Sequence, residues 1–377
     1  MTTRSARSGY RRIVAKLGTN LLTAGTDRLD IDLMSALVGQ VVRLIDEGRE
    51  VLVVTSGAIA AGRERLNERG HRRDIPFRQA LAAVGQAHLM QTYDRLFAAH
   101  GRVVAQTLLT RGDLSDRVGY LNARNTMLGL LDMGVVPIIN ENDTVALDEI
   151  AGSKIGDNDN LSALVANLVD ADLLAILTDT GGLYTADPRK DKTALIIGTV
   201  ERITKEIEAR AGGSESGRGI GGMITKLQAA KLATGGGSDV FVANGHEPNV
   251  LHRIAHGEHV GTKFPARISR MESRKRWMLS GLATKGSIIV DAGAARALVE
   301  RKKSLLPAGV ASVQGSFKRG DAVAVCLPDG SQLGVGISNY GADELGTIKG
   351  VRSDRIEEVL GYQYGSEVVH RNNLVLL

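Results

Sequence analysis

The sequence predicts an α/β fold in which helices cover both faces of a mostly parallel sheet, followed by a small, mainly β domain. Two observations support this prediction. In the first two thirds of the chain, short apolar runs alternate with segments of helical periodicity, which is typical of parallel sheets. After a basic stretch at residues 263–276 the apolar runs are separated by glycine-containing turns, which indicates a β domain.

The strands predicted for the larger domain are short runs of Val, Ile, Leu and Ala. They lie at residues 13–15, 51–54, 103–105, 135–139, 173–177 and 240–243. Between the first two runs, apolar side chains recur with the spacing of one helix face, and Gly48 ends this helix. Ligands of parallel sheets bind beyond the carboxyl ends of the strands. The residues that follow these runs are therefore the candidates for function.

The smaller domain is predicted to have strands near residues 287–290, 322–327 and 333–337, with one helix at about 293–301. We expect a catalytic domain over residues 1–270, a linker over 271–284 and a β domain over 285–377.

Composition narrows the possible functions. The chain has 377 residues, of which 43% are hydrophobic and 24% charged, as in an ordinary globular protein. The net charge of +5 suits anionic substrates such as nucleotides, but it is too small to indicate a nucleic-acid partner. The single cysteine, Cys326, excludes an internal disulfide and a thiolate metal cluster, and its apolar surroundings predict a buried, unreactive side chain.

The same reading predicts a cytoplasmic protein without a metal centre of its own. No apolar run approaches the roughly 18 residues of a membrane span, and no apolar segment of a signal peptide follows the arginine-rich N-terminus. His252, His256 and His259 lie close in sequence, but they match no recognised zinc spacing and have no cysteine partner.

Two glycine-containing segments follow the first two predicted strands. Lys16 ends the first strand, and Gly18 makes a turn after it. Ser56 and Gly57 follow the second strand and precede a helix of small residues, whose N-terminal N–H groups would suit an anion. Each signal is weak by itself, because a lysine at a strand end is often a solvated surface residue.

Carboxylates and amides gather in two further segments, residues 139–143 and 156–162. Asp and Asn are common helix caps, so a capping turn is one interpretation of the second segment. A calcium loop counted from Asp157 fails, because Ser162 stands where glycine is required and Leu168 where glutamate is required. The functional interpretation is a site that binds an α-amino group and orders Mg-ATP.

A glycine-rich loop at residues 217–226 precedes a helix and carries Lys226. Gly217, Gly219 and Gly222 have the spacing of a dinucleotide-binding loop, but a helical segment leads into it where a strand is required. No Gly-Lys-Ser/Thr occurs in the chain, which excludes a Walker A loop. A mobile surface loop and a phosphate clamp of a different kind remain as interpretations.

This inventory matches phosphoryl transfer to a carboxylate. The carboxylate nucleophile is already ionised at neutral pH, so the reaction needs no general base. It needs lysines, backbone N–H groups and Mg²⁺ to bring two anions together and to stabilise charge on the transferred group.

Together the segments resemble the amino acid kinase family, in the branch that phosphorylates the side-chain carboxylate of free L-glutamate with ATP to open proline biosynthesis. The residues that carry the resemblance are 14–19, 54–62, 139–143, 156–164, 183–188 and 221–226. Residues from 285 onward are similar to a PUA domain. The resemblance implies an αβα sandwich with both substrates at the carboxyl edge of the sheet.

The resemblance also implies roles for individual residues. Lys16 and Lys226 would contact the phosphates, and Asp159 would orient both lysines. Glutamate would be bound by Ser56, Asp143 and Asn158, with Asp157 close by. The nucleotide would be held by Lys16, Thr178, Asp179, Ile220, Gly221, Gly222, Met223, Ile224, Thr225 and Lys226. Ile220 departs from the small or hydroxyl residue common in related sequences. Mg²⁺ would arrive mainly with ATP, without a metal site built by the protein.

Partners and alternatives complete the expectations. The resemblance implies a homo-oligomer, feedback inhibition by proline and a partner reductase for glutamyl phosphate. The nearest alternative is a family member acting on acetylglutamate, aspartate, carbamate or a nucleoside monophosphate, although the polar cluster at residues 140–143 favours a free α-amino group. RNA binding by the PUA-like domain is a second alternative, which the 11 basic and 10 acidic residues of 285–377 do not favour.

Overall fold

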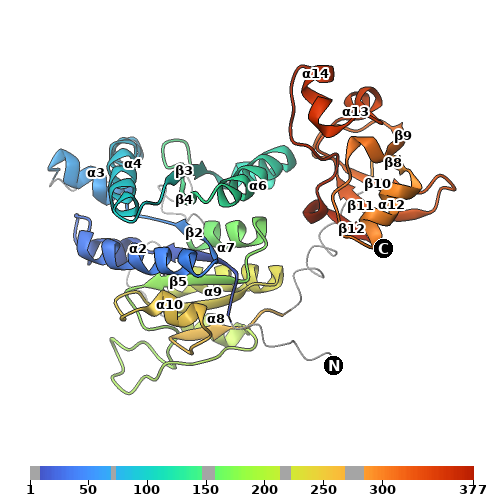
Figure 1. Ribbon diagram of the computed structural model, residues 1–377. Coiled ribbons are helices and arrows are strands. Elements are labelled where there is room, and N and C mark those ends of the chain that lie inside the picture. The colour runs from blue at the N-terminus through green and yellow to red at the C-terminus, as the bar shows by residue number, and fades with distance from the viewer. Residues whose placement is uncertain (1–8, 69–73, 147–157, 213–221, 268–283) are drawn as a thin grey trace. The chain divides into compact units, whose positions relative to one another are not determined.

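The computed structural model describes residues 9–68, 74–146, 158–212, 222–267 and 284–377 (Figure 1). The chain divides into two compact units, residues 1–115 with 122–270 and residues 116–121 with 271–377. The expected linker at 271–284 lies outside the described residues except for Thr284.

The larger unit contains a seven-stranded sheet in the order β3-β4-β2-β1-β5-β6-β7. Neighbouring strands are parallel except for β6 and β7, which confirms the prediction of a mostly parallel sheet. The strands are β1 (Arg12–Leu17), β2 (Glu50–Val54), β3 (Val104–Leu109), β4 (Val136–Glu141), β5 (Leu173–Thr178), β6 (Asp239–Asn244) and β7 (Thr262–Phe264).

Helices cover both faces of this sheet, so the larger unit is the expected αβα sandwich (Figure 1). Its helices are α1 (Thr19–Thr23), α2 (Ile31–Asp46), α3 (Ala58–Leu66), α4 (Ile75–Ala98), α5 (Arg111–Ser115), α6 (Arg117–Asp132, of which residues 117–121 are assigned to the smaller unit), α7 (Asn158–Leu168), α8 (Lys205–Gly212), α9 (Met223–Gly236) and α10 (Val250–Ala255).

The alternation of side chains along β1 decides which face carries polar residues. Ile13, Ala15 and Leu17 belong to a core cluster with apolar side chains of α2, α4 and α10. Because successive strand residues point to opposite faces, Val14 and Lys16 point to the other face. There α7 packs against α9 and against β1. Lys16 is therefore directed toward two helices that both begin near the carboxyl edge of the sheet.

Helices α3 and α4 cross with their backbones in direct contact. A Cβ atom at Gly85 would lie 1.8 Å from the carbonyl oxygen of Ala58, and one at Gly62 would lie 2.0 Å from that of Leu81. Only glycine allows this approach, which fixes the position where α3 begins. Gly57 precedes α3 with φ of 95°, a left-handed conformation that also favours glycine.

The smaller unit is a five-stranded sheet in the order β12-β11-β10-β8-β9. Cys326 is buried in β10, and its burial raises the pKa of the thiol, as expected for an unreactive cysteine. The strands are β8 (Gly286–Val290), β9 (Val310–Gly315), β10 (Ala322–Cys326), β11 (Gln332–Ile337) and β12 (Leu374–Leu376).

One helix of the smaller unit was predicted, and α12 (Ala292–Val299) corresponds to it. The expectation of a single helix was wrong, because α13 (Ala342–Ile348) and α14 (Ile356–Leu360) are helices as well. They have seven and five residues, too few for a helical period to show in the sequence. Among the described residues of both units, no helix has the length and apolar character to span a membrane.

The crossing of α3 and α4 gives a first testable prediction. Gly85→Ala places a methyl group into backbone atoms, so the free energy of unfolding should fall by about 3 kcal/mol. Gly39→Ala in α2 is the matched control, because nothing lies within 4 Å of its added Cβ. It should raise stability by about 0.5–1 kcal/mol. Urea denaturation measures both, and a Gly85→Ala variant as stable as the wild type would contradict the backbone contact.

Candidate active site

Two lysines and one aspartate form the centre of the candidate site. The Nζ atom of Lys16 lies 2.5 Å from Oδ1 of Asp159, and the Nζ atom of Lys226 lies 3.1 Å from Oδ2 of the same carboxylate. Lys16 is 3%, Asp159 0% and Lys226 7% exposed. Burying three charges is costly unless each is paired and hydrogen-bonded. The shared carboxylate pairs both lysines and leaves one positive charge in excess among the three groups.

Three elements from distant parts of the sequence place these groups. Lys16 comes from β1, Asp159 from the first turn of α7 and Lys226 from the first turn of α9. The hydroxyl of Thr225 donates a hydrogen bond of 2.8 Å to Oδ2 of Asp159. One oxygen of the carboxylate is thus ion-paired with Lys16 of β1, and the other accepts hydrogen bonds from two consecutive residues of α9, so its orientation is fixed.

A cavity of about 430 Å³ opens beside this cluster. Its volume lies in the usual range for a small-molecule site. Lys16, Lys226, Asn140, Asp143, Asn158, Thr178 and Asp179 are among the residues that line it. Residues 57–59 at the N-terminus of α3 also line the cavity, and N–H groups at a helix start favour an anion.

Buried amides lie on one side of the cavity. Asn158 donates a hydrogen bond of 3.3 Å from Nδ2 to Oγ of Ser56, and Asn140 donates one of 2.8 Å from Nδ2 to Oε1 of Gln86. The Oδ1 atoms of Asn140 and Asn158 are buried and meet no donor among the described residues. An unsatisfied buried acceptor costs free energy, so these oxygens suit a ligand that brings N–H donors.

Ser56 is held in place by the end of β2. The N–H of the preceding Thr55 donates 2.8 Å to the carbonyl of Ile139, and the Thr55 hydroxyl lies 2.8 Å from that of Tyr93 in α4. Burial raises the pKa of Tyr93, which therefore remains neutral. These contacts join the strand ends of β2 and β4 to α4.

Hydrogen bonds also order the other side of the cavity. Thr178 ends β5 and donates 2.9 Å from its hydroxyl to Oδ1 of Asp179. Asn20 in α1 donates 3.3 Å from Nδ2 to Oδ2 of the same carboxylate. The N–H of Gly18 donates 3.1 Å to the carbonyl of Leu177. The turns after β1 and β5 are thereby fixed side by side at the carboxyl edge of the sheet.

The predicted nucleotide residues divide into three groups. Thr178, Asp179, Lys16 and Lys226 line the cavity. Gly222 caps α9, whose first turn contains Met223, Ile224 and Thr225, and none of these four residues is among those that line the cavity. Ile224 lines a separate surface hollow with Leu227. Ile220 and Gly221, together with the substrate candidate Asp157, lie outside the described residues.

Sequence reasoning missed two basic side chains of the cavity wall. Arg63 from α3 and Arg78 from α4 line the same cavity as Lys16. Neither follows a predicted strand, and both sit in helices with several other charged residues. Only the close crossing of α3 and α4 brings them to the site, and no sequence signal marked that crossing.

Comparisons with known proteins show the family of the chain. Residues 11–244 match the model of the amino acid kinase family, and residues 286–360 match that of the PUA domain. The chain belongs to the amino acid kinase family.

Full-length relatives place the chain among the glutamate 5-kinases of this family. It is 53% identical to the Glutamate 5-kinase of Dehalococcoides mccartyi, over 98% of this chain and 99% of that protein. It is 52% identical to that of Herpetosiphon aurantiacus, over 98% and 99%, and 51% identical to that of Deinococcus radiodurans, over 97% and 100%. A solved UMP kinase from Bacillus anthracis aligns with 69% of this chain at a TM-score of 0.48 and 19% identity, which is too low to bear on function.

The lysine–aspartate cluster gives a second testable prediction. Asp159→Ala leaves Lys16 and Lys226 without their shared counter-charge, so the free energy of unfolding should fall by about 3 kcal/mol. Lys226→Met should cost less, because Asp159 keeps its partner Lys16. Urea denaturation of both variants measures the difference. Equal stabilities for Asp159→Ala and the wild type would show that the carboxylate is not needed to compensate the lysines.

Proposed function

We propose that this chain transfers the γ-phosphoryl group of ATP to the γ-carboxylate of free L-glutamate, giving L-glutamyl 5-phosphate and ADP at the start of proline biosynthesis. One observation supports it most directly. Lys16 and Lys226 share the buried carboxylate of Asp159 at the wall of a cavity that also contains buried amide acceptors. The names of the full-length relatives indicate the same reaction.

The reaction needs electrostatic stabilisation more than proton transfer. A γ-carboxylate oxygen forms a bond to the γ-phosphorus, the bond from phosphorus to the β,γ-bridging oxygen breaks, and ADP carries away the electron pair. The carboxylate is ionised at neutral pH and loses no proton. Lys16 and Lys226 donate hydrogen bonds to the transferring phosphoryl oxygens, and Asp159 keeps both ammonium groups at fixed positions.

Glutamate is proposed to bind on the amide side of the cavity. The unsatisfied Oδ1 atoms of Asn140 and Asn158 and the nearby carboxylate of Asp143 suit an α-ammonium group, which offers three N–H donors. An acetylated amino group carries no charge for Asp143 to pair with. Ser56 acts through its hydrogen bond with Asn158.

The cavity also fits Mg²⁺ that arrives with the nucleotide. Asp179 lines it, and Mg²⁺ commonly takes one or two carboxylate oxygens in addition to phosphate oxygens. When bound, the ion would neutralise charge on the phosphates. Thr178 and Asp179 are proposed to order the nucleotide on this side.

Further properties expected from the sequence and from the resemblance are also proposals. They are a cytoplasmic location, a homo-oligomer, inhibition by proline at or near the glutamate site, and transfer of the unstable acyl phosphate to a partner reductase. RNA binding by the PUA-like domain is tested by the shift of labelled RNA at low ionic strength.

The substrate is tested by trapping the acyl phosphate with hydroxylamine. We expect hydroxamate from ATP, Mg²⁺ and free glutamate, and none from N-acetylglutamate or aspartate. Hydroxamate from another acid alone would overturn the substrate and keep the chemistry. The absence of product from every acid, with folded protein, would overturn the proposed reaction.

Lys226→Ala should lower kcat on the order of 10²–10³-fold, because it removes a donor to the transferring group. Lys231→Ala is the matched control. This lysine lies on the same helix, is exposed and pairs at the surface with Glu208, so its loss should leave kcat near the wild-type value. Initial rates of hydroxamate formation measure both, and near-normal turnover of Lys226→Ala would remove this residue from the mechanism.

Asp143→Ala should act mainly on the KM for glutamate, since the proposed contact is present both before and during phosphoryl transfer. We expect KM to rise at least about tenfold, which corresponds to about 1.4 kcal/mol of lost binding, with a smaller change in kcat. The KM for ATP serves as the internal control. An unchanged KM for glutamate would exclude Asp143 from the substrate site.

A further inference from the structure

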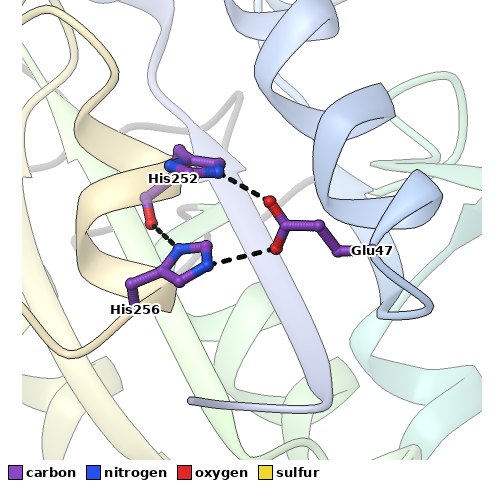
Figure 2. Close-up of side chains that lie close together, drawn as sticks. All are labelled: Glu47, His252 and His256. Carbon is purple, nitrogen blue, oxygen red and sulfur yellow. Dashed lines mark hydrogen bonds and ion pairs between the residues drawn. The ribbon is translucent and has the colours of Figure 1, made fainter. Parts of the chain in front are cut away.

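A cluster of one glutamate and two histidines lies outside the active site (Figure 2). Glu47 caps the C-terminal end of α2, and His252 and His256 lie one turn apart at the end of α10. The Nε2 atom of His252 is 2.7 Å from Oε1 of Glu47, and the Nε2 atom of His256 is 3.2 Å from Oε2. Both rings thus direct a nitrogen to the same carboxylate, although Glu47 and His252 are 205 residues apart in sequence.

We propose that Glu47, His252 and His256 bind a transition-metal dication of the Zn²⁺ class. Imidazole nitrogen and carboxylate oxygen are common ligands of these ions. The candidate donor atoms all lie within 4.8 Å of one another. Two ligands of a tetrahedral ion at about 2.0–2.1 Å are roughly 3.3 Å apart, so donor atoms that lie up to 4.8 Å apart would close on the ion by at most about 1.5 Å. A water molecule would take the fourth position.

The tautomer of His256 suits metal binding. Its Nδ1 atom lies 2.8 Å from the carbonyl oxygen of His252, an acceptor, so Nδ1 carries the proton. In the neutral ring the lone pair then lies on Nε2, which faces the carboxylate of Glu47. Two lone pairs directed at each other are unfavourable unless a proton or a cation lies between them. A hydrogen bond from the distal ring nitrogen to a carbonyl is also what commonly orients metal-binding histidines.

In the structure, the side chain of Arg49 donates hydrogen bonds to the same acceptor atoms of His256 and Glu47. Its Nη2 atom is 3.0 Å from Nε2 of His256, and its Nε atom is 3.1 Å from Oε2 of Glu47. Its Nη1 atom donates to the carbonyls of Tyr10 and Ala255, at 2.8 and 2.7 Å. The Arg49 guanidinium therefore holds the side chains of Glu47 and His256 together when no ion is bound. An ion would compete with it for the same acceptor atoms. Removing its charge should strengthen metal binding.

The topology places this cluster away from the reaction. Glu47 follows α2 and comes just before β2 begins at Glu50, and Ala255 accepts a hydrogen bond from the N–H of Tyr10, which precedes β1. The cluster therefore lies at the amino edge of the parallel strands, whereas the cavity lies at their carboxyl edge. An ion here would join α2 to α10 and stabilise the fold without entering catalysis.

The test is titration of the full chain with Zn²⁺ alone, by calorimetry without nucleotide. We expect His252→Gln and His256→Gln to lose one equivalent of bound Zn²⁺ or at least about tenfold in its affinity. Zn²⁺ should raise the Tm of the wild type more than that of either variant. His259→Ala is the matched control, because this exposed histidine lies three residues beyond His256 and outside the cluster.

Further measurements separate the outcomes. Co²⁺ in place of Zn²⁺ should give visible absorption bands in the wild type and in His259→Ala, but weaker bands in His252→Gln. The rate of hydroxamate formation should stay within about twofold of the wild-type rate in both variants. Folded Arg49→Ala should bind Zn²⁺ more tightly than the wild type. Three outcomes would overturn the proposal: equal Zn²⁺ binding by the wild type and the two Gln variants, no binding by the wild type, or weaker binding by Arg49→Ala. Each would mean that Glu47 and the two histidines form only an ion pair.

Discussion

A buried carboxylate that must be paired governs the arrangement of the catalytic unit. Asp159 is fully buried, and its two oxygens face Lys16 on one side and Lys226 with Thr225 on the other. Losing Asp159 would leave two ammonium groups without their shared counter-charge in a medium where charges are poorly solvated. The strand that carries Lys16 and the two helices that carry the other groups are therefore tied to one another by electrostatics as well as by packing.

The remaining fold presents this cluster to ligands. Parallel strands end at one edge, so the turns after β1, β2, β4 and β5 converge there. The glycine contacts between α3 and α4 set the start of α3, whose first residues line the cavity. The polar groups are positioned before any ligand arrives, which is the condition under which fixed charges accelerate phosphoryl transfer.

Sequence reasoning found what has a local pattern and missed what depends on distant contacts. The six parallel strands of the larger sheet were predictable because buried parallel strands are continuous apolar runs, and Lys16 was marked by its place at a strand end. The short antiparallel strand β7 was not predicted, because its three residues form no such run. The resemblance supplied the expectation that Asp159 contacts both lysines. Arg63, which depends on a helix crossing, had no local signal. The sequence did not show that Glu47 lies beside His252 and His256, because these residues are about 205 positions apart and a search for zinc spacing considers only residues close in sequence.

The central claim is that Asp159 acts by holding the lysines, and a double-mutant cycle of Asp159→Asn and Lys226→Ala tests it most directly. The rate of hydroxamate formation at saturating ATP and glutamate is measured for the wild type, both single variants and the double variant. If the carboxylate acts through Lys226, the second substitution adds little, and the double variant is nearly as active as the slower single variant. Rate losses that simply multiply would show that the two residues act independently and would contradict the account.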